Sequence, residues 1–261
     1  MNAPSPGYYT SVGPFRELFA TGQPVLTYHH VGPRPRGVRL KGLYVSPKLF
    51  GQQIAELKAE GFETDTFGRV SSSQVGSKRV FLTFDDGFSD VFENALWRLC
   101  QHGFCSIQFL VGDLLGKTSE CQKSSGELPG NLMDKVQIKD WLASGQEIGS
   151  HTLTHPRLTQ IPATQSREEI FGSKKKLEDG FGREIEHFCY PYGDWNPAIR
   201  DIVAEAGYKS ACTTKFGLNT AEADRFALKR ITVRYPSLKL KNMGVWLRSA
   251  LRNGKKMGAK T

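Results

Sequence analysis

The sequence predicts one α/β domain in which parallel strands form the centre and helices lie outside them. Short apolar runs rich in β-branched and aromatic residues alternate with longer segments whose apolar residues recur every three or four positions. This alternation is typical of parallel sheets with helical connections. The chain has 261 residues, of which 39% are hydrophobic, and it shows no internal repeat or linker. These values are typical of a globular protein, and the unbroken alternation favours a single domain.

Strand and helix signals follow one another from residue 24 onward. The run PVLTYH predicts a buried strand at 24–29. Ser46 and Pro47 then have the pattern of an N-cap followed by proline at the first helical position, and this helix ends near Gly61. By the same criteria we expect strands at 79–84 and 106–111, with a helix around Val91, Ala95 and Leu99 between them.

The second half of the chain continues the alternation after an irregular stretch. Residues 112–134 lack any periodicity and are predicted to form a surface insertion. Strands are then expected at 147–150, 186–190, 208–213 and 227–233, and helices around Trp141, at about 165–178, and around Ile199 and Val203. We therefore divide the chain into an N-terminal extension (1–23), the α/β domain (24–236) and a C-terminal segment (237–261).

The sequence carries none of the signals of a secreted or membrane-spanning protein. No window approaches the roughly 20 apolar residues of a membrane span. Residues 1–15 lack the basic and apolar regions of a secretory signal. The five cysteines are odd in number and follow no C-x-x-C spacing, which favours a reduced setting. We therefore expect a cytoplasmic protein.

The formal net charge of +9 arises at the C-terminal end of the chain. Eleven of the 35 basic residues follow Asp224 and no acidic residue does, which leaves 24 basic against 26 acidic residues in the rest. Within 237–261, apolar residues fall on one helical face and basic residues on another. Such a helix can lie peripherally on an anionic membrane, or it can pack on the domain with its lysines in solvent. Nucleic acid is a weaker interpretation, because no fold signature or aromatic stacking platform accompanies the charge.

Polar residues follow or close four of the predicted strands. They are His29, the pair Asp85 and Asp86, His151, and the stretch from Tyr190 to Tyr192. Parallel α/β folds build their active sites at the carboxyl ends of the strands. We therefore expect these residues to meet in one site.

His151 and His155 indicate a metal site. They lie four residues apart in HTLTHP, a spacing that brings two imidazoles to one side of a helical turn. Taken alone, this pattern also fits two surface or core histidines. Together with a carboxylate from a neighbouring strand end, it supplies three ligands and an open position, as catalytic metal sites do.

The pair Asp85 and Asp86 then allows a division of roles. One carboxylate binds the metal, and the other stays free to accept a proton from the attacking water, whose pKa a catalytic zinc lowers toward about 7. Capping of the following helix would explain one aspartate but not two. The two residues by themselves leave open which carboxylate has which role.

Three stretches of the sequence carry a resemblance to a known family. TFDDG (83–87), HTLTHP (151–156) and YPYG (190–193) resemble three motifs of the polysaccharide deacetylases, the NodB-homology enzymes. The resemblance covers about residues 24–234. It implies a single distorted (β/α) barrel of about seven parallel strands, and removal of N-acetyl groups from sugars with the help of a divalent metal.

The resemblance also implies roles for individual residues. Asp85 matches the catalytic base, and Asp86, His151 and His155 match the metal ligands. Tyr192 matches the residue whose backbone N–H binds the oxyanion. The metal expected from this resemblance is zinc, with cobalt or nickel as alternatives.

The sequence departs from the pattern of the family at two points. Cys189 stands where the third motif commonly opens with an arginine that steadies the catalytic aspartate, and no histidine follows His187, so the usual late histidine is missing. The stretch VLTYHHVG (25–32) is similar to a subgroup with circularly permuted motif order, the poly-N-acetylglucosamine deacetylases. This similarity implies His29 as the general acid. By the alternation of side chains along an extended chain, we expect its neighbour His30 to point away from the site.

The roles that we assign to His29 and Arg230 each have an alternative. His29 also fits a core histidine that is hydrogen-bonded to the backbone. Arg230, in the predicted strand 227–233, is our candidate for the missing arginine as an electrostatic partner of Asp85, and a surface position fits it almost as well.

We therefore expect a hydrolase that removes N-acetyl groups from an amino sugar in a polysaccharide, an oligosaccharide or a lipid-linked glycan. Asp85 would deprotonate the water, Tyr192 would stabilise the oxyanion and His29 would protonate the leaving nitrogen, which predicts a bell-shaped pH profile. The alternatives are a related C–N hydrolase, such as a sugar deformylase or an amidase, and a non-catalytic carbohydrate-binding protein that has kept the metal site. The loop 33–44 and the insertion 112–134 are expected to shape the substrate groove.

Overall fold

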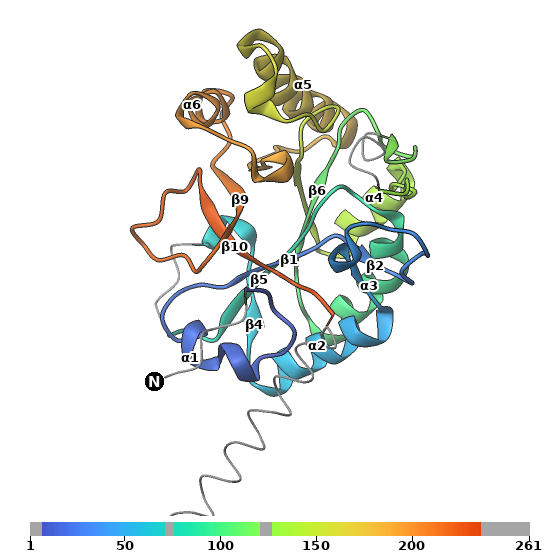
Figure 1. Ribbon diagram of the computed structural model, residues 1–261, viewed down its shortest axis with the longest axis vertical. Helices are drawn as coiled ribbons and strands as arrows, with labels where there is room; N and C mark the ends of the chain where they lie inside the picture. Colours follow the sequence, from blue (N-terminus) through green and yellow to red (C-terminus); the bar gives the residue numbers. More distant parts are fainter. Residues whose placement is uncertain (1–6, 71–75, 121–126, 236–261) are drawn as a thin grey trace, which may run out of the picture.

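The computed structural model describes residues 7–70, 76–120 and 127–235, which form a closed barrel of seven parallel strands surrounded by helices (Figure 1). The ring closes because β1 pairs with both β5 and β10. The predicted barrel of about seven parallel strands is confirmed. In order around the ring the strands are β1 (Val25–Tyr28), β10 (Leu228–Thr232), β9 (Ser210–Phe216), β8 (His187–Cys189), β7 (Glu147–Ser150), β6 (Ile107–Leu110) and β5 (Arg79–Phe84).

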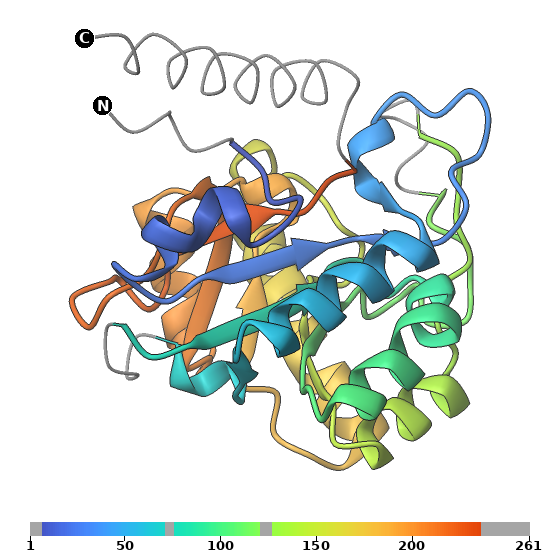
Figure 2. The same cartoon turned by 90° about the horizontal axis from the view of Figure 1, so that it is seen from below.

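The predicted helices lie outside the barrel, and ordinary capping residues begin and end them. Ser46 caps the first of them by accepting a hydrogen bond from the backbone N–H of Leu49 at 3.2 Å, and Gly103 ends the next with a left-handed φ of 65°. Figure 2 shows α2, α3 and α4 side by side along one side of the barrel. The helices are α2 (Pro47–Ala59), α3 (Ser89–His102), α4 (Lys135–Ala143), α5 (Ala163–Phe181) and α6 (Pro197–Glu205).

Several short elements were not predicted, because two to four residues are too few to show periodicity. β4 (Glu63–Thr64) pairs with the beginning of β5 outside the ring. β2 (His30–Val31) and β3 (Tyr44–Val45) form a separate parallel pair. This pair connects the chain beyond β1 to the end of the loop at 33–44.

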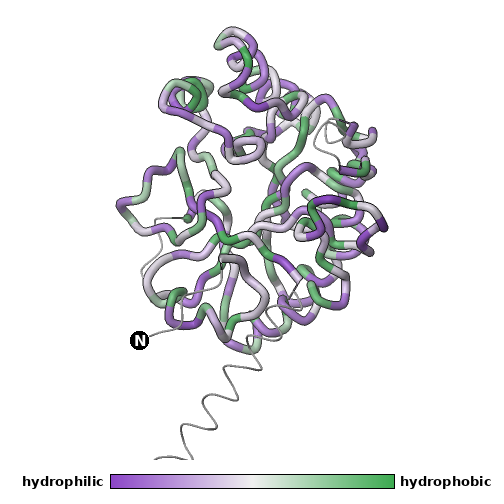
Figure 3. Tube along the Cα trace, in the orientation of Figure 1, coloured by the Kyte–Doolittle hydropathy of each residue, from purple (hydrophilic) through white to green (hydrophobic). Residues whose placement is uncertain are grey.

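The barrel interior has an apolar layer and a polar layer. On β5 the side chains alternate, so that Phe81 packs inside with Phe109 while Leu82 packs against the helices. Thr83 also faces the interior, where its Oγ1 accepts a hydrogen bond from Arg230 of β10. The carboxylate of Asp85 accepts from the same guanidinium. Figure 3 shows the hydrophobic residues along strands such as β6. The polar layer therefore lies at the carboxyl ends of the strands.

The described part of the predicted N-terminal extension packs against the barrel. The backbone N–H of Tyr9 donates to the carbonyl of Thr232 at 2.8 Å, and the N–H of Arg234 donates to the carbonyl of Tyr9 at 3.0 Å. Phe15 and Phe19 are buried, the latter in α1 (Arg16–Phe19). Residues 7–23 thus contribute to the hydrophobic core and continue the hydrogen bonding of β10 beyond its end.

The C-terminal segment 237–261, for which a basic amphipathic helix was expected, lies outside the described residues. Within the described ranges, no helix combines the length and the apolar composition that are needed to cross a membrane.

Candidate active site

The predicted site residues lie together in the polar layer at the carboxyl ends of the strands. Asp85 and Asp86 follow β5, His151 follows β7 and His29 follows β1. Arg230 belongs to β10, and its side chain is buried in the same layer. Because all strands of the ring are parallel, their carboxyl ends open at one mouth of the barrel.

The adjacent carboxylates of Asp85 and Asp86 both enter the site because the backbone turns between them. The N–H of Asp85 still donates to the carbonyl of Tyr28 at 3.0 Å, which continues the ladder between β1 and β5. Asp86 then has a left-handed φ of 72°, and Gly87 follows with 88°. A regular strand would direct the two side chains to opposite faces. The left-handed conformation costs a non-glycine residue about 1–2 kcal/mol, a strain that is often found at functional sites.

Arg230 binds Asp85 through a bidentate ion pair that is almost completely buried. Its two terminal nitrogens donate to Oδ1 and Oδ2 of Asp85, each at 2.8 Å, and the side chains are 1% and 3% exposed. Burial by itself raises the pKa of Asp85, but the charge and the hydrogen bonds of Arg230 outweigh it and hold that pKa below its ordinary value. Asp85 is therefore an ionised carboxylate whose remaining lone pairs can accept a proton.

The other donors of Arg230 are satisfied by neighbouring strands. Nε donates to the carbonyl of Thr213 at 2.8 Å, Nη1 to Oγ1 of Thr83 at 3.1 Å, and Nη2 to Sγ of Cys189 at 3.2 Å. All five N–H groups have partners, which fixes the plane of the guanidinium. The small side chain of Cys189, at the position where an arginine was expected, packs directly against this guanidinium.

Asp86, His151 and His155 form a buried cluster of three metal-ligand types. Oδ1 of Asp86 lies 3.3 Å from Nε2 of each histidine. Ligands about 2.0–2.1 Å from a tetrahedral zinc lie roughly 3.3 Å from one another, so the spacing fits such an ion. Burial by itself raises the pKa of Asp86, but hydrogen bonds from both imidazoles outweigh it and lower that pKa well below its ordinary value. The cluster therefore offers one carboxylate and two imidazole ligands.

The ring orientation of His151 also suits a metal. Its Nδ1 lies 2.7 Å from the carbonyl oxygen of Cys189. Because a carbonyl only accepts, Nδ1 donates its proton to Cys189, and this hydrogen bond orients the ring so that Nε2 faces Asp86. Nδ1 of His155 is buried without a hydrogen-bond partner among the described residues, and its Nε2 faces Asp86.

The two histidines lie in an irregular loop, not on a helical turn as their spacing suggested. Thr152 and His155 both have a left-handed φ of 67°, and the N–H of His155 donates to Oγ1 of Thr152 at 2.9 Å. Glu169 on α5 holds this loop, because its carboxylate accepts from the N–H groups of Leu153 and Thr154 at 2.8 and 2.9 Å. Glu169 was not predicted, since a glutamate within an amphipathic helix gives no signal that distinguishes it from an exposed one.

A second set of candidate ligands, Asp85, His151 and Cys189, overlaps the first. Both oxygens of Asp85 and the sulfur of Cys189 accept hydrogen bonds from the guanidinium of Arg230. Burial raises the pKa of the Cys189 thiol well above its ordinary value, so it stays protonated, whereas metals bind the thiolate. The geometry and the charge therefore favour the Asp86 cluster.

His29 and His30 point in opposite directions, as their alternation predicted. Nε2 of His29 lies 3.8 Å from Oδ2 of Asp85, too far for a hydrogen bond, and the His29 side chain is 19% exposed. Nδ1 of His30 lies 2.8 Å from Oδ2 of Asp90, and its ring is stacked between two aromatic rings. Burial lowers the pKa of His29, although the carboxylates of Asp85 and Asp86 oppose this effect.

Tyr192 lies beside the metal-ligand cluster with a strained backbone. Its φ of 61° and ψ of 4° place it in the left-handed region. The centre of its ring lies 4.6 Å from that of His155, and the guanidinium of Arg157 lies 4.1 Å from the ring. The YPYG turn is thus held against the loop that carries the histidines.

The barrel and this arrangement of side chains define a family of hydrolases. The model of the polysaccharide deacetylase family matches residues 72–211, and the chain belongs to that family.

Comparison with individual proteins agrees with this assignment. The chain is 25% identical to YxkH, a candidate polysaccharide deacetylase of Bacillus subtilis (strain 168), over 87% of this chain and 76% of that one. It is 26% identical to a chitooligosaccharide deacetylase of Bradyrhizobium sp. (strain ANU 289), over 54% of this chain and 56% of that one. The solved structure of the Streptococcus pyogenes deacetylase PplD in complex with acetate superposes with a TM-score of 0.70 and 25% identity, covering 85% of this chain and 97% of that one.

Proposed function

We propose that this chain is a metal-dependent hydrolase that removes N-acetyl groups from an amino sugar within a glycan. One observation carries the proposal. An ionised carboxylate, Asp85, is held by Arg230 directly beside the separate cluster of Asp86, His151 and His155. A site with a free base next to three metal ligands is suited to hydrolysis, whereas a binding protein would need no such base.

Asp86, His151 and His155 would hold the metal, and zinc suits their one-carboxylate, two-imidazole set. When bound, the ion polarises the acyl oxygen and lowers the pKa of water. Cobalt and nickel accept the same ligand types and remain alternatives for the metal in solution.

The residues of the chain then divide the proton transfers. Asp85 accepts a proton from the attacking water, and Arg230 keeps that carboxylate ionised and oriented. The backbone N–H of Tyr192 donates to the oxygen of the acyl group as the carbon becomes tetrahedral. His29 donates a proton to the nitrogen, so the C–N bond breaks and acetate and a free amine leave.

The substrate class follows from the chemistry and from the relatives. The Bradyrhizobium relative is named for chitooligosaccharides, and the Streptococcus structure contains acetate. Both support an N-acetylated amino sugar in a polysaccharide, an oligosaccharide or a lipid-linked glycan as the substrate of this chain.

The location of the enzyme is also part of the proposal. The four described cysteines are free thiols, which supports a reducing cytoplasmic setting. The basic residues of 237–261 support a peripheral contact with anionic membranes. Replacing Lys255 and Lys256 with glutamine in the full chain would weaken co-sedimentation with anionic liposomes, and unchanged binding would contradict the contact.

Acetate release from a panel of free, oligomeric and lipid-linked N-acetylated sugars tests the function. We expect release that a chelator abolishes and that zinc or cobalt restores. Release of formate from formylated analogues, with none from acetylated sugars, would instead indicate a deformylase. Binding of glycans without any release, in protein with a full complement of metal, would indicate a binding protein.

A further inference from the structure

Gln108 is a polar residue that lies completely buried on the outer face of β6. Its neighbours in the strand, Ile107 and Phe109, belong to the apolar cluster inside the barrel, whereas Leu110 belongs to the cluster beneath the helices. Alternation therefore directs Gln108, like Leu110, toward the helices. An apolar side chain is expected at such a position, because burying an amide is costly unless its hydrogen bonds are made.

The side-chain amide of Gln108 contacts the backbone at the end of β5. Its Nε2 donates to the carbonyl oxygens of Phe84 and Asp85, each at 3.3 Å. The NH2 group has two hydrogens, so each carbonyl can accept one of them. The carbonyl of Asp85 belongs to the peptide group that joins Asp85 to Asp86. Gln108 therefore holds the link between the proposed base and the first of the candidate metal ligands.

The amide of Gln108 is satisfied on one side only. Its Oε1 is buried and has no hydrogen-bond partner among the described residues. Gln146, another buried glutamine, differs in this respect, because its Nε2 donates to the carbonyl of Phe104 at 3.1 Å and its Oε1 accepts from Oγ of Ser106 at 2.8 Å. Buried polar atoms are normally paired, and exceptions are expected at functional positions. The orphaned oxygen thus points to a function for the NH2 group.

The contact of Gln108 lies where the chain leaves the strand. Asp86 and Gly87 have left-handed φ values of 72° and 88°, and this turn directs both aspartate carboxylates into the site. The turn also packs on the outer face of β6, because a Cβ at Gly87 would lie 3.0 Å from Cδ2 of Leu110. Gln108 and Leu110 therefore support the turn from the same face. The orientation of the peptide between the two aspartates decides where both carboxylates point.

We propose that Gln108 is a positioning residue for the candidate active site. Its amide fixes the peptide between Asp85 and Asp86, so that one carboxylate serves as the base while the other faces His151 and His155. The hydrogen bonds from β6 hold the strained backbone of Asp86 in its left-handed conformation. This inference rests on the proposed function for the role of Asp85, and it assigns a residue that touches neither substrate nor metal.

The first test is Gln108→Met in the full-length chain, because methionine has a similar length and no donor. Without the amide, the peptide is free to rotate and the ligand oxygen of Asp86 moves. We expect the zinc dissociation constant, measured by competition with a chromogenic chelator, to rise about 10–100-fold, as after loss of other outer partners of metal sites. The visible absorption of the cobalt-loaded protein should also change, because it reports the geometry of the ligands. A merely structural role would change only the free energy of unfolding.

Gln146→Met is the matched control. Gln146 is also a buried glutamine that donates to a backbone carbonyl, but it directly precedes β7, at the end of the strands opposite the site. The substitution should lower the free energy of unfolding without altering the zinc affinity or the cobalt spectrum. Equal changes of these two quantities in Gln146→Met and Gln108→Met would reduce the effect to the loss of a buried amide and would overturn the proposal.

A second variant, Gln108→Glu, tests the same contact without a change of shape. An oxygen then replaces the NH2 group beside the carbonyls of Phe84 and Asp85. The zinc affinity and the cobalt spectrum should shift in the same direction as in Gln108→Met, and the conserved shape excludes a packing defect as the cause. Wild-type values of both quantities in Gln108→Met and Gln108→Glu would show that the turn holds its shape without these hydrogen bonds, and the proposal would be wrong.

Acetate release separates this inference from the function on which it rests. We expect the kcat of Gln108→Met to fall by about 10²-fold, the usual cost of displacing a reacting group by about 1 Å, and KM to stay unchanged because Gln108 does not contact the substrate. A changed cobalt spectrum in the variant, with no acetate release even by wild type, retains the positioning role and overturns the deacetylase function. Equal kcat and identical spectra in wild type and variant retain the function and overturn the positioning role.

Discussion

Arg230 on β10 donates to both carboxylate oxygens of Asp85 at the end of β5, each at 2.8 Å, although 145 residues separate the two in the chain. The same guanidinium contacts Sγ of Cys189 at 3.2 Å. An arginine was expected from the family pattern at the position of Cys189 on β8. A strand elsewhere in the barrel thus supplies the same chemical group to the same carboxylate.

We predict that Arg230→Gln impairs both stability and activity. Removing one partner of a buried ion pair leaves the carboxylate of Asp85 uncompensated, which typically costs about 3–5 kcal/mol of unfolding free energy. The pKa of Asp85 would rise without the guanidinium, so the acidic limb of the pH–rate profile should move to higher pH. Urea denaturation and the pH dependence of acetate release measure the two effects.

Two further variants distinguish the role of Arg230 as the partner of Asp85 from a general effect of lost charge. Arg225→Gln removes an exposed arginine just before β10 and should change neither quantity. Adding Cys189→Arg to Arg230→Gln restores a guanidinium from β8 and should recover part of the activity. An unshifted acidic limb in Arg230→Gln would contradict the assignment.

We predict that Glu169→Ala weakens metal binding although Glu169 is not a ligand. The carboxylate holds the loop that carries His151 and His155, and loss of such outer partners typically costs 10–100-fold in metal affinity. Competition with a chromogenic chelator measures the dissociation constant. Glu168→Ala, at the exposed neighbouring position on α5, is the matched control. Wild-type affinity in Glu169→Ala would show that the loop holds its shape without this carboxylate.

We predict that His29→Ala lowers kcat by roughly 10²–10⁴-fold, the usual contribution of a general acid. The basic limb of the pH–rate profile should disappear, because that limb reports loss of the His29 proton. The metal content should stay at the wild-type level, since His29 is outside the cluster of Asp86, His151 and His155. A variant with near-normal turnover and both limbs intact would assign the acid to another group.

His187 should make the protein less stable in mild acid. Burial lowers its pKa to about 4 from the ordinary 6.5, and Nδ1 lies 2.9 Å from Oγ of Ser210. Between these values the unfolded chain binds a proton that the folded chain does not, so the unfolding free energy falls as the pH falls from 6.5 to 4. The full loss is roughly 3 kcal/mol.

His187→Gln should therefore have a shallower dependence of stability on pH in this window, measured by urea denaturation at successive pH values. His102→Gln, at the last residue of α3, should retain the wild-type slope. An identical slope in wild type and His187→Gln would place the acid sensitivity elsewhere.

Much of the site could be predicted because chain order and geometry coincide in parallel barrels. A polar motif directly after a strand lies at the barrel mouth whichever strand carries it, so the motifs of β5, β7 and β8 were expected to meet. The alternation of side chains likewise separated His29 from His30. For these residues, the pattern of neighbouring residues in the sequence was sufficient to predict their position in the site.

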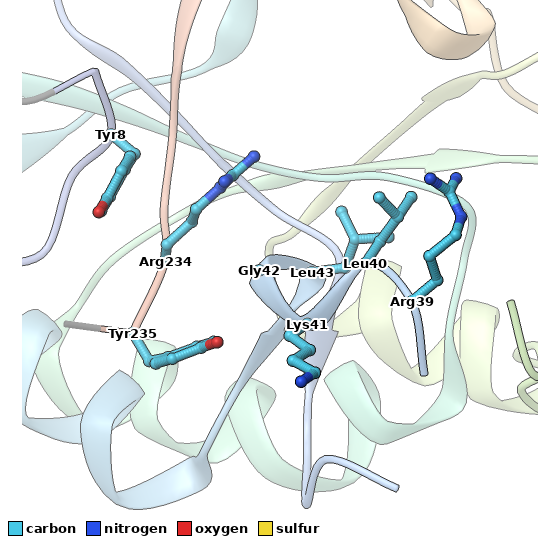
Figure 4. A pocket seen from close by; sticks show the side chains of 8 residues that line it. All are labelled: Tyr8, Arg39, Leu40, Lys41, Gly42, Leu43, Arg234 and Tyr235. Atoms are coloured by element: carbon cyan, nitrogen blue, oxygen red, sulfur yellow. The ribbon is translucent and has the colours of Figure 1, made fainter. Parts of the chain in front are cut away.

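Other contacts depend on packing between distant segments, which local pattern does not encode. The loop around His155 resembled a helical turn because the spacing of two histidines contains no information on φ, and its left-handed residues are held by Glu169 from α5. The close approach of Gly42 to the side chain of Arg234, nearly two hundred positions further along the chain, is another such contact (Figure 4).

The sequence by itself determined the α/β class, the order of strands and helices, and the residues at the strand ends, because each depends on periodicity and on chain direction. The tertiary structure alone decided which arginine binds Asp85. The strand pattern of 227–233 fitted a buried and an exposed Arg230 almost equally, and only closure of the ring through β1 places β10 near enough to β5 for the two charges to pair.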